Sequence, residues 1–413
     1  MNVQQAPEWL PSYLIPFFTL SYPTAPPAAP DSFPNASYYK NGLLDGCLII
    51  TFIAVMAVLR DVARLWILEP FCSWKLTRDL RLSLQAKRAA ANGNGKANGA
   101  TNGVGKVNGV ANGMGKANGV ANRIGEANGH IVVNGKANGV ANGNGHAVYA
   151  NENGHTVYVS GVVISRKQAK KIHRSVLRFA EQGWPVIYYS CLWSLGVYVH
   201  SNLPTKILNP IDVWTSYPHI PLAAPLKFYY LLQTAFYCHQ ILILNAEARR
   251  KDHWQMMTHH IITVALMVAS YFFNFTRVGC LILMITDWCD IFLPLAKMFR
   301  YLSLSTLCDV TFVWFMISWA VTRHALFILV IISTYTAMNT IPPRLDVEHG
   351  FYTTREIFSG FLVLLSMLQV IQIMWFWMIC RVAWRVVSGQ GAEDSRSDDE
   401  DGDDLDEETK KDR

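Results

Sequence analysis

The sequence predicts an all-α integral membrane protein, a multi-span helical bundle of about seven transmembrane helices. Composition is the first reason: 51% of the 413 residues are hydrophobic and 16% are charged, whereas soluble domains carry about 25% charged residues. The second is a series of apolar runs long enough to cross a hydrocarbon core of ~30 Å. The net charge of +6 comes from bases that lie between these runs. These bases therefore indicate how the protein is oriented in the membrane, and we expect no nucleic-acid partner.

Seven apolar runs have the length of a membrane-spanning helix. They cover residues 43–59, 184–203, 226–245, 255–275, 278–299, 307–333 and 359–380. The first run starts too far along the chain, behind a proline-rich stretch at 23–34, to be a cleaved signal peptide. We therefore expect residues 1–42 to form a luminal arm and 43–59 to be the first transmembrane helix.

Lys and Arg indicate the orientation of these helices. Clusters follow the first run within 60–90, precede the second at 166–178, follow the third at 249–251 and follow the last at 381–385. With seven spans, all four clusters lie on one side, which is the cytosolic side by the positive-inside rule. The N-terminus is then luminal and the C-terminus cytosolic.

Two short motifs agree with this topology. Asn35 begins an Asn-Ala-Ser sequon on the predicted luminal arm, so N-glycosylation of Asn35 is expected. Lys410 and Lys411 are fourth and third from the C-terminal end, the pattern of a cytosolic dilysine signal for return to the endoplasmic reticulum. The sequence predicts a multi-pass protein of the endoplasmic reticulum membrane.

Three polar segments lie outside the predicted membrane domain. Residues 60–90 form a basic cytosolic segment, and 91–155 form a low-complexity Asn-Gly repeat with a period of ten. The repeat offers no apolar face to bury, so we expect a flexible insert. Residues 386–413 form an acidic cytosolic tail, in which Ser395 and Ser397 each precede an acid by three positions. Phosphorylation of these serines is one interpretation, and a purely solubilising tail is the other.

Ionisable groups within membrane spans indicate function, because burying them in lipid is unfavourable. His259 and His260 begin the fourth run, and Asp287 and Asp290 lie near the middle of the fifth. The two acids are i, i+3 and share a helix face. A short turn joins the two runs, so they are antiparallel neighbours. We expect a buried His–Asp dyad beneath the cytosolic face.

Such a dyad suits acyl transfer. An Asp that accepts the Nδ1–H of a histidine leaves Nε2 free as a base or nucleophile. A metal site and purely structural histidines are the alternatives, but tandem histidines converge poorly on one ion, so we predict no metal. Arg323 lies within the sixth run and should pair with an acid, either Asp309 or the Asp287–Asp290 pair.

A longer pattern around these residues resembles the Lag motif of the ceramide synthases in the TLC-domain family, most closely its fungal members. The matching segments are Arg249-Arg250-Lys251-Asp252-His253-Trp254, His259-His260-Ile261-Ile262-Thr263, Ser270-Tyr271, Arg277-Val278-Gly279, Asp287-x-x-Asp290 and Ala296-Lys297-Met298-Phe299. The resemblance covers 160–385, interpreted as a TLC-type catalytic membrane domain. Many animal members have His where this chain has Thr286.

The resemblance implies a sphingosine N-acyltransferase, which joins the acyl group of acyl-CoA to the amine of a sphingoid base. The catalytic positions that it implies are His259, His260, Asp287 and Asp290. A histidine would act as general base or as nucleophile, and acyl-CoA is a co-substrate, so no bound cofactor is expected. At the cytosolic mouth, Arg249, Arg250 and Lys251 are placed to meet the nucleotide phosphates.

The expected partners are acyl-CoA, a sphingoid base and membrane lipid. By the same resemblance, a small single-span regulatory subunit and a homo- or hetero-oligomer are further candidates. The alternative function is a non-catalytic TLC-type protein for lipid binding or translocation, which would need no His–Asp set. A transporter is less favoured, because the two halves of the sequence show no internal repeat.

Overall fold

The computed structural model divides into two compact units, which are described separately. It describes residues 11–97, 148–150, 156–159, 162–246 and 252–388. The larger unit comprises the chain up to Glu69 and from Leu177 onward, and the smaller comprises Pro70–Val176. All described residues of the predicted site lie in the larger unit.

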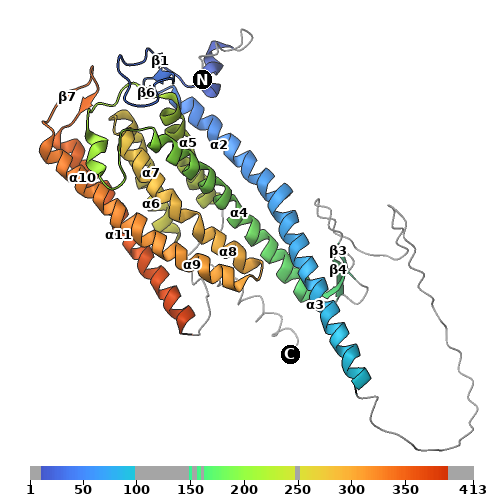
Figure 1. The fold of residues 1–413 in the computed structure, drawn as a ribbon. Helices are drawn as coiled ribbons and strands as arrows, with labels where there is room; N and C mark the ends of the chain where they lie inside the picture. Colours follow the sequence, from blue (N-terminus) through green and yellow to red (C-terminus); the bar gives the residue numbers. More distant parts are fainter. Residues whose placement is uncertain (1–10, 98–147, 151–155, 160–161, 247–251, 389–413) are drawn as a thin grey trace, which may run out of the picture. The chain divides into compact units, whose positions relative to one another are not determined.

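The larger unit is a bundle of long helices that run alongside one another (Figure 1). Its helices are α1 (Ile15–Phe18), α2 (Asp45–Val62), α4 (Arg166–Ser201) from Leu177 on, α5 (Ala224–Ala246), α6 (His253–Phe272), α7 (Thr276–Asp290), α8 (Phe292–Tyr301), α9 (Ser305–Trp319), α10 (Phe327–Thr340) and α11 (Arg355–Val387). Short 3-10 or π-helical segments extend or join them: η1 (Ser12–Leu14), η2 (Ala63–Leu68), η3 (Pro210–Trp214) and η4 (Ala320–Leu326). Helix α5 packs against α2 and α6, and α10 packs against α11.

The membrane character of the chain is confirmed, whereas the predicted number of spans is matched only in part. Four helical stretches of the described chain are long and apolar enough to cross a membrane: Asp45–Lys87, Thr276–Tyr301, Ser305–Thr340 and Arg355–Val387. The predicted runs at 184–203, 226–245 and 255–275 also lie in helices, namely α4, α5 and α6. Buried polar side chains such as Lys227 and Gln233 on α5 make these helices less apolar.

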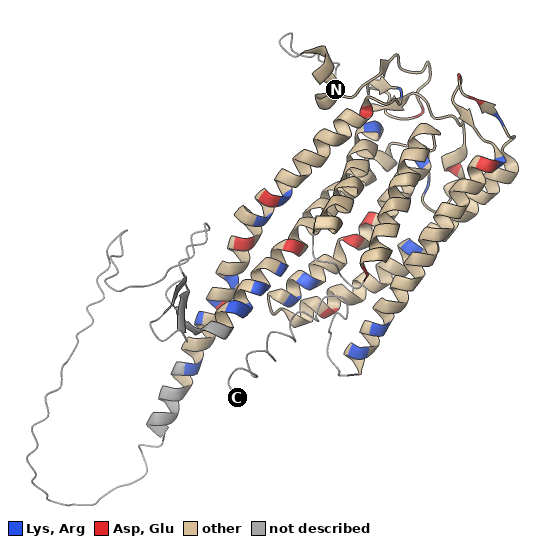
Figure 2. Cartoon of the chain, turned by 180° about the vertical axis from the view of Figure 1, so that it is seen from behind, with Lys and Arg blue, Asp and Glu red and all other residues tan. Residues whose placement is uncertain are grey.

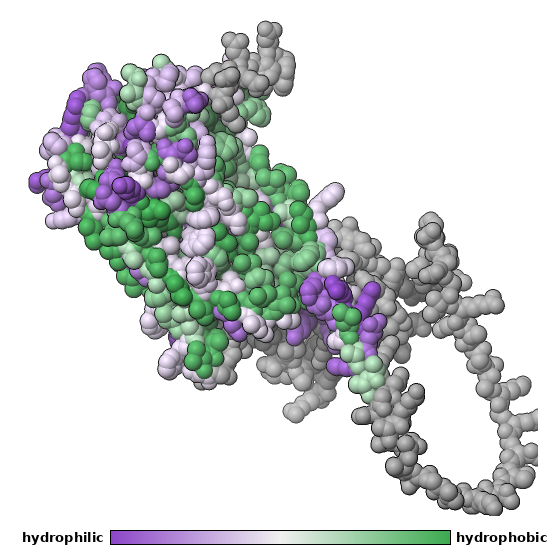
Figure 3. Space-filling view, viewed as in Figure 1, coloured by the Kyte–Doolittle hydropathy of each residue, from purple (hydrophilic) through white to green (hydrophobic). Residues whose placement is uncertain are grey.

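Loops and short strands gather at one end of the bundle, here called the loop end, defined by residues 11–44, 202–223 and 341–354 (Figure 1). Strands β1 (Pro23–Thr24), β2 (Tyr38–Tyr39) and β6 (Leu222–Ala223) form an antiparallel sheet in that order, and β7 (Leu345–Asp346) pairs with β8 (Phe351–Tyr352). Apolar side chains cover the sides of the helices, and polar ones cover the loop end (Figure 3). This distribution is typical of a bundle that is surrounded by lipid.

A buried ion pair fastens the N-terminal arm to the bundle. Lys227 Nζ lies 2.7 Å from Asp45 Oδ1, and both side chains are at most 2% exposed. Lys227 also donates hydrogen bonds to the backbone carbonyls of Ser21 and Lys40, each at 2.8 Å. The hydroxyl of Tyr271 donates to Asp45 Oδ2 at 2.7 Å. The pair therefore joins the arm, α2, α5 and α6 in a single polar network.

The smaller unit contains α3 (Glu69–Ala97), apart from its first residue, the start of α4 and a three-stranded antiparallel sheet. Its strands β3 (Val148–Ala150), β4 (Thr156–Val159) and β5 (Val162–Ser165) pair in that order. Helix α3 extends into the predicted 91–155 insert, and β3 lies inside it, so helix and strand structure reaches further than the repeat pattern indicated. The rest of the Asn-Gly repeat lies outside the described residues.

Replacing Lys227 by Met should strongly destabilise the protein. The substitution leaves the Asp45 carboxylate buried without its cation, which lowers the free energy of unfolding by about 3–5 kcal/mol. The double variant Asp45→Asn/Lys227→Met should regain most of this loss, because no unpaired charge remains. Thermal unfolding in detergent measures both, with Arg344→Ala at the exposed Arg344–Asp346 pair as the control. A double variant no more stable than the single would contradict this account.

Lowering the pH should reduce the stability of the folded protein through His219, which lies at the loop end. Burial, with the nearby positive charge of Arg277, lowers the pKa of His219 to about 4. The unfolded chain, with a histidine pKa of about 6.5, therefore binds more protons between these values, and stability falls as the pH decreases from about 6.5 toward 4. We expect His219→Gln to show a smaller drop in melting temperature between pH 7.5 and pH 5. An unchanged drop would assign the acid sensitivity to other groups.

Candidate active site

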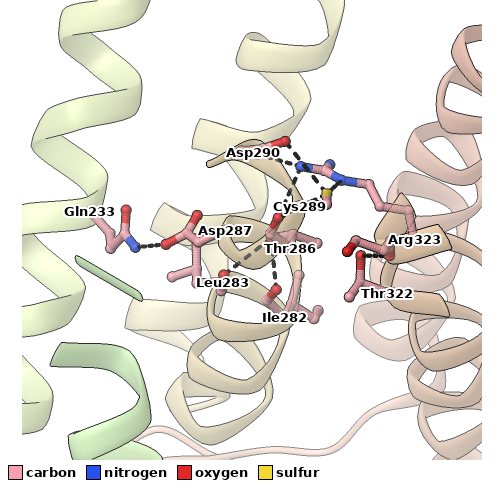
Figure 4. Close-up of polar contacts among 10 residues, drawn as sticks. Gln233, Ile282, Leu283, Thr286, Asp287, Cys289, Asp290, Thr322 and Arg323 are labelled. Atoms are coloured by element: carbon pink, nitrogen blue, oxygen red, sulfur yellow. Dashed lines mark hydrogen bonds and ion pairs between the residues drawn. The ribbon is translucent and has the colours of Figure 1, made fainter. Parts of the chain in front are cut away.

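The two aspartates of α7 have different partners, which lie on different sides of the helix (Figure 4). Asp287 is fully buried and accepts a hydrogen bond from Gln233 Nε2 on α5. Asp290 forms an ion pair with Arg323 on η4 and remains 20% exposed. One carboxylate therefore faces an amide, and the other faces a guanidinium.

Gln233 is itself held in place by tyrosines. The hydroxyl of Tyr188 on α4 donates to Gln233 Oε1 at 3.1 Å, and Gln233 Nε2 also lies 3.2 Å from the Tyr229 hydroxyl. These contacts fix which end of the amide faces Asp287. The second carboxylate oxygen, Asp287 Oδ1, is buried and has no hydrogen-bond partner among the described residues.

Arg323 links α7 to the α9–α10 helical stretch. Its Nε donates to Cys289 Sγ at 3.1 Å, and one terminal nitrogen donates to both Asp290 and the carbonyl of Thr286 (Figure 4). The guanidinium lies 5.0 Å from the ring centre of Trp319. The predicted pairing of Arg323 with an acid is confirmed, and its partner is Asp290. Arg323 stands on a π-helical segment, a type of distortion that is frequent at functional sites.

His259 and His260 are buried and point to different neighbours. The ring centre of His259 lies 5.1 Å from that of Trp375 on α11, and the ring centre of His260 lies 5.9 Å from that of Tyr237 on α5. Both Nδ1 atoms lack hydrogen-bond partners among the described residues. The expected direct His–Asp hydrogen bond is not among the contacts of the described chain, because the carboxylates turn to Gln233 and Arg323.

These residues make up the polar layer of the bundle, defined as Gln233, His259, His260, Asp287, Asp290 and Arg323. A narrow apolar cavity of about 60 Å³ lies next to it, toward the loop end. Its walls come from α5, α6, α7, α10 and α11 and include Thr263 and Leu283, one helical turn from His259 and Asp287. Tyr230 and Ser270, which are hydrogen-bonded to each other, also line the cavity. Its apolar walls lie one helical turn from buried titratable groups, although its volume is below the roughly 300–1,000 Å³ of a typical ligand pocket.

The structure locates the other predicted site residues only in part. Asn35 is exposed in a turn of the N-terminal arm, at the loop end. Arg249, Arg250 and Lys251 lie outside the described residues, as do Ser395, Ser397 and the dilysine motif. Within the described chain, no three His, Cys, Asp or Glu side chains converge as metal ligands, and no step below is assigned to a metal.

Sequence reasoning missed two kinds of site residue. Gln233 is an amide within an apolar run. A polar side chain in such a run is the same kind of signal as the buried acids, and it could have identified the partner of Asp287. Trp375 is one of 13 tryptophans, and nothing in its local sequence distinguishes it from the lipid-facing Trp377. Only the packing of α11 against α6 brings Trp375 to His259.

Comparison with known proteins finds sequence similarity over this part of the chain. Residues 178–381 match the family model described as the TLC domain. Sphingosine N-acyltransferase lag1 of Schizosaccharomyces pombe is 43% identical over 227 residues, which are 54% of this chain and 58% of that protein. Sphingosine N-acyltransferase-like protein ALT7 of Alternaria alternata is 37% identical over 261 residues, covering 55% and 60%. Ceramide synthase 4 of Bos taurus is 31% identical over 230 residues, covering 55% and 56%.

The chain thus spans somewhat more than half the length of these relatives, and the similarity falls on the part that carries the polar layer. All six residues of that layer lie within 178–381. Residues 178–381 therefore match the TLC domain, and over about half its length the chain is similar to fungal and animal ceramide synthases.

Proposed function

We propose that this protein is a ceramide synthase, which transfers a fatty acyl group from acyl-CoA to the amine of a sphingoid base. One observation carries the proposal: two buried imidazoles and a buried carboxylate oxygen without partners lie beside an apolar cavity in a TLC domain. Unpaired buried polar atoms are unfavourable unless a ligand satisfies them. A lipid amine satisfies the unpaired polar atoms, and the apolar walls of the cavity match the chemistry of its hydrocarbon chain.

The chemistry needs a base or a nucleophile at the thioester. In the first route, a histidine removes a proton from the amine, the nitrogen attacks the thioester carbon, and the carbon–sulfur bond breaks to release coenzyme A. In the second, an imidazole nitrogen attacks first and forms an acyl-imidazole, which the amine then resolves. Both routes form one amide bond and one free thiol, and neither requires a metal or a bound cofactor.

The two aspartates have separate roles in this proposal. Asp287 Oδ1 receives the ammonium group of the base, while Gln233 holds the other carboxylate oxygen. Asp290 instead neutralises Arg323 and ties α7 to η4. A carboxylate near the amine favours binding of the charged, ammonium form of the substrate. It also stabilises the positive charge that returns to the nitrogen when the deprotonated amine attacks the thioester carbon. The sequence alone assigned the same role to both acids.

The full membrane topology belongs to the proposal as well. Seven spans place the loop end, with Asn35, in the lumen, and α6 then starts at the cytosolic side. Within the larger unit, most Lys and Arg residues lie toward the end away from the loops (Figure 2). Arg249, Arg250 and Lys251 immediately precede α6, where the phosphates of coenzyme A would arrive from the cytosol. Residence in the endoplasmic reticulum is proposed on the dilysine motif and the resemblance. A single-span regulatory subunit and an oligomeric assembly are proposed on the resemblance alone.

Alanine at either histidine of the polar layer should abolish ceramide formation. We expect His259→Ala and His260→Ala each to lower the rate at least ~100-fold, because general acid–base catalysis supplies about 10²–10⁴. Microsomes with equal amounts of each variant, supplied with acyl-CoA and a sphingoid base, give the measurement. His349→Ala, in an exposed loop, is the matched control and should keep full activity. Wild-type rates in both variants would overturn the histidine-dependent mechanism, whereas a wild-type rate no higher than that of microsomes without the protein would favour a non-catalytic lipid-binding protein.

Asparagine substitutions should distinguish the two aspartates. Asp287→Asn should lower kcat/KM for the base about 10–100-fold at unchanged melting temperature, because it removes the ammonium partner without unpairing another charge. Asp290→Asn should lower the melting temperature, because Arg323 is left buried without its counter-ion. Adding Arg323→Gln to Asp290→Asn should recover part of that stability. Equal effects of the two single variants on both readouts would argue against separate roles.

A further inference from the structure

Two tryptophans beside the polar layer have buried indole N–H groups without a hydrogen-bond partner among the described residues. Trp319 is 6% exposed and Trp375 is 7% exposed, and the Nε1 atom of each is buried and unpaired. A buried indole usually finds an acceptor, and Trp214 does so, because its Nε1 donates to Ser333 Oγ at 3.3 Å. The two unpaired donors therefore require an explanation.

Both indoles belong to the same cluster as His259. The rings of Trp375 and His259 are inclined by 66° with centres 5.1 Å apart, and the Trp319 ring centre lies 6.4 Å from that of Trp375. Trp319 and Trp375 also pack together in one apolar cluster with Cys289. A thioester carbonyl that is attacked at the His259 side of the layer would therefore lie close to the rings of Trp319 and Trp375.

The same region contains the Arg323 guanidinium, whose counter-ion is Asp290. The Arg323 guanidinium lies over the Trp319 ring, and its charge acts on His259. In an interior from which water is excluded, fixed donors and a nearby cation stabilise a developing negative charge far more than they do in water. The surroundings of His259 on the α9–α11 side are suited to an anion that forms only transiently.

We propose that Trp375, together with Trp319, forms the oxyanion hole for the thioester carbonyl. When a nitrogen attacks the carbonyl carbon, the new C–N bond forms and the π electron pair moves onto the carbonyl oxygen. The indole N–H groups donate hydrogen bonds to that oxygen. When the pair returns to carbon, the C–S bond breaks, and coenzyme A leaves as the thiolate, which takes up the proton released by the amine. This proposal rests on the acyltransferase function proposed above.

The proposal also assigns the two substrates to different sides of the polar layer. The two unpaired indole N–H groups lie on α9 and α11, whereas the unpaired carboxylate oxygen of the polar layer, Asp287 Oδ1, lies on α7. An acyl thioester offers an acceptor, and an ammonium group offers donors. The thioester therefore binds on the His259 side, and the amine binds on the side of Gln233 and Asp287.

Trp375→Phe tests the oxyanion hole, because it removes the N–H and keeps an aromatic ring against His259. We expect kcat to fall about 100-fold, the loss typical for one oxyanion donor, with KM for the sphingoid base within about twofold and an unchanged melting temperature. Trp319→Phe should act in the same direction. The controls are Trp377→Phe, on the same helix and 64% exposed, and Trp184→Phe, which removes a buried unpaired indole N–H packed against Tyr188. Both should keep kcat. A wild-type kcat in Trp375→Phe would overturn the proposal.

A binding measurement separates this proposal from the acyltransferase function itself. Two acyl-CoA analogues are compared: a ketone in which CH2 replaces the thioester sulfur, and a thioether that lacks the carbonyl oxygen. The wild-type protein should bind the ketone at least about fivefold more tightly, and Trp375→Phe should lose this preference. A preference that is absent in the wild type, or kept in the variant, would overturn the oxyanion hole. If the preference is lost in the variant but no ceramide forms with wild-type protein, the proposed reaction fails and the carbonyl site stands.

Discussion

The ion pair between Asp290 and Arg323 joins helices whose paired residues are 33 positions apart in the chain. Neither charge is stable alone in an apolar interior, because an unpaired buried ion loses its hydration without compensation. Their attraction therefore determines how α7 meets the α9–α10 stretch, and it also places Trp319 and Cys289 around the guanidinium. This contact is part of the polar layer, and the helices that it aligns surround the two histidines of that layer.

The polar layer combines satisfied and unsatisfied groups in a way that a purely structural network would not. Gln233, Tyr188 and one oxygen of Asp287 are mutually hydrogen-bonded, which gives them a defined geometry. The other oxygen of Asp287, both histidine Nδ1 atoms and two indoles have no partner among the described residues. Rigid support combined with free donors and acceptors is the arrangement that catalysis by preorganised polar groups requires. A small cavity with apolar walls lies one helical turn from the layer.

Local sequence patterns predicted much of this molecule correctly. The apolar runs coincide with helices because each run has to bury its own backbone polar groups, and a helix does so without help from the rest of the chain. The need of Arg323 for an acid also follows from its position in a run. The choice of Asp290 over Asp309 does not follow, and neither does the separation of the histidines from the aspartates. Both depend on helix rotation, and an error of one residue turns a side chain by 100°.

The sequence by itself determined the class of the protein, the helices and the set of ionisable residues that had to be buried, because length, hydropathy and charge act within each segment. Only the tertiary structure decided which of those residues meet. It paired Asp287 with Gln233, placed Trp375 rather than Trp377 at His259, and fastened the N-terminal arm through Lys227 and Asp45. These contacts join distant segments, and their geometry arises from the packing of whole helices, which no local pattern encodes.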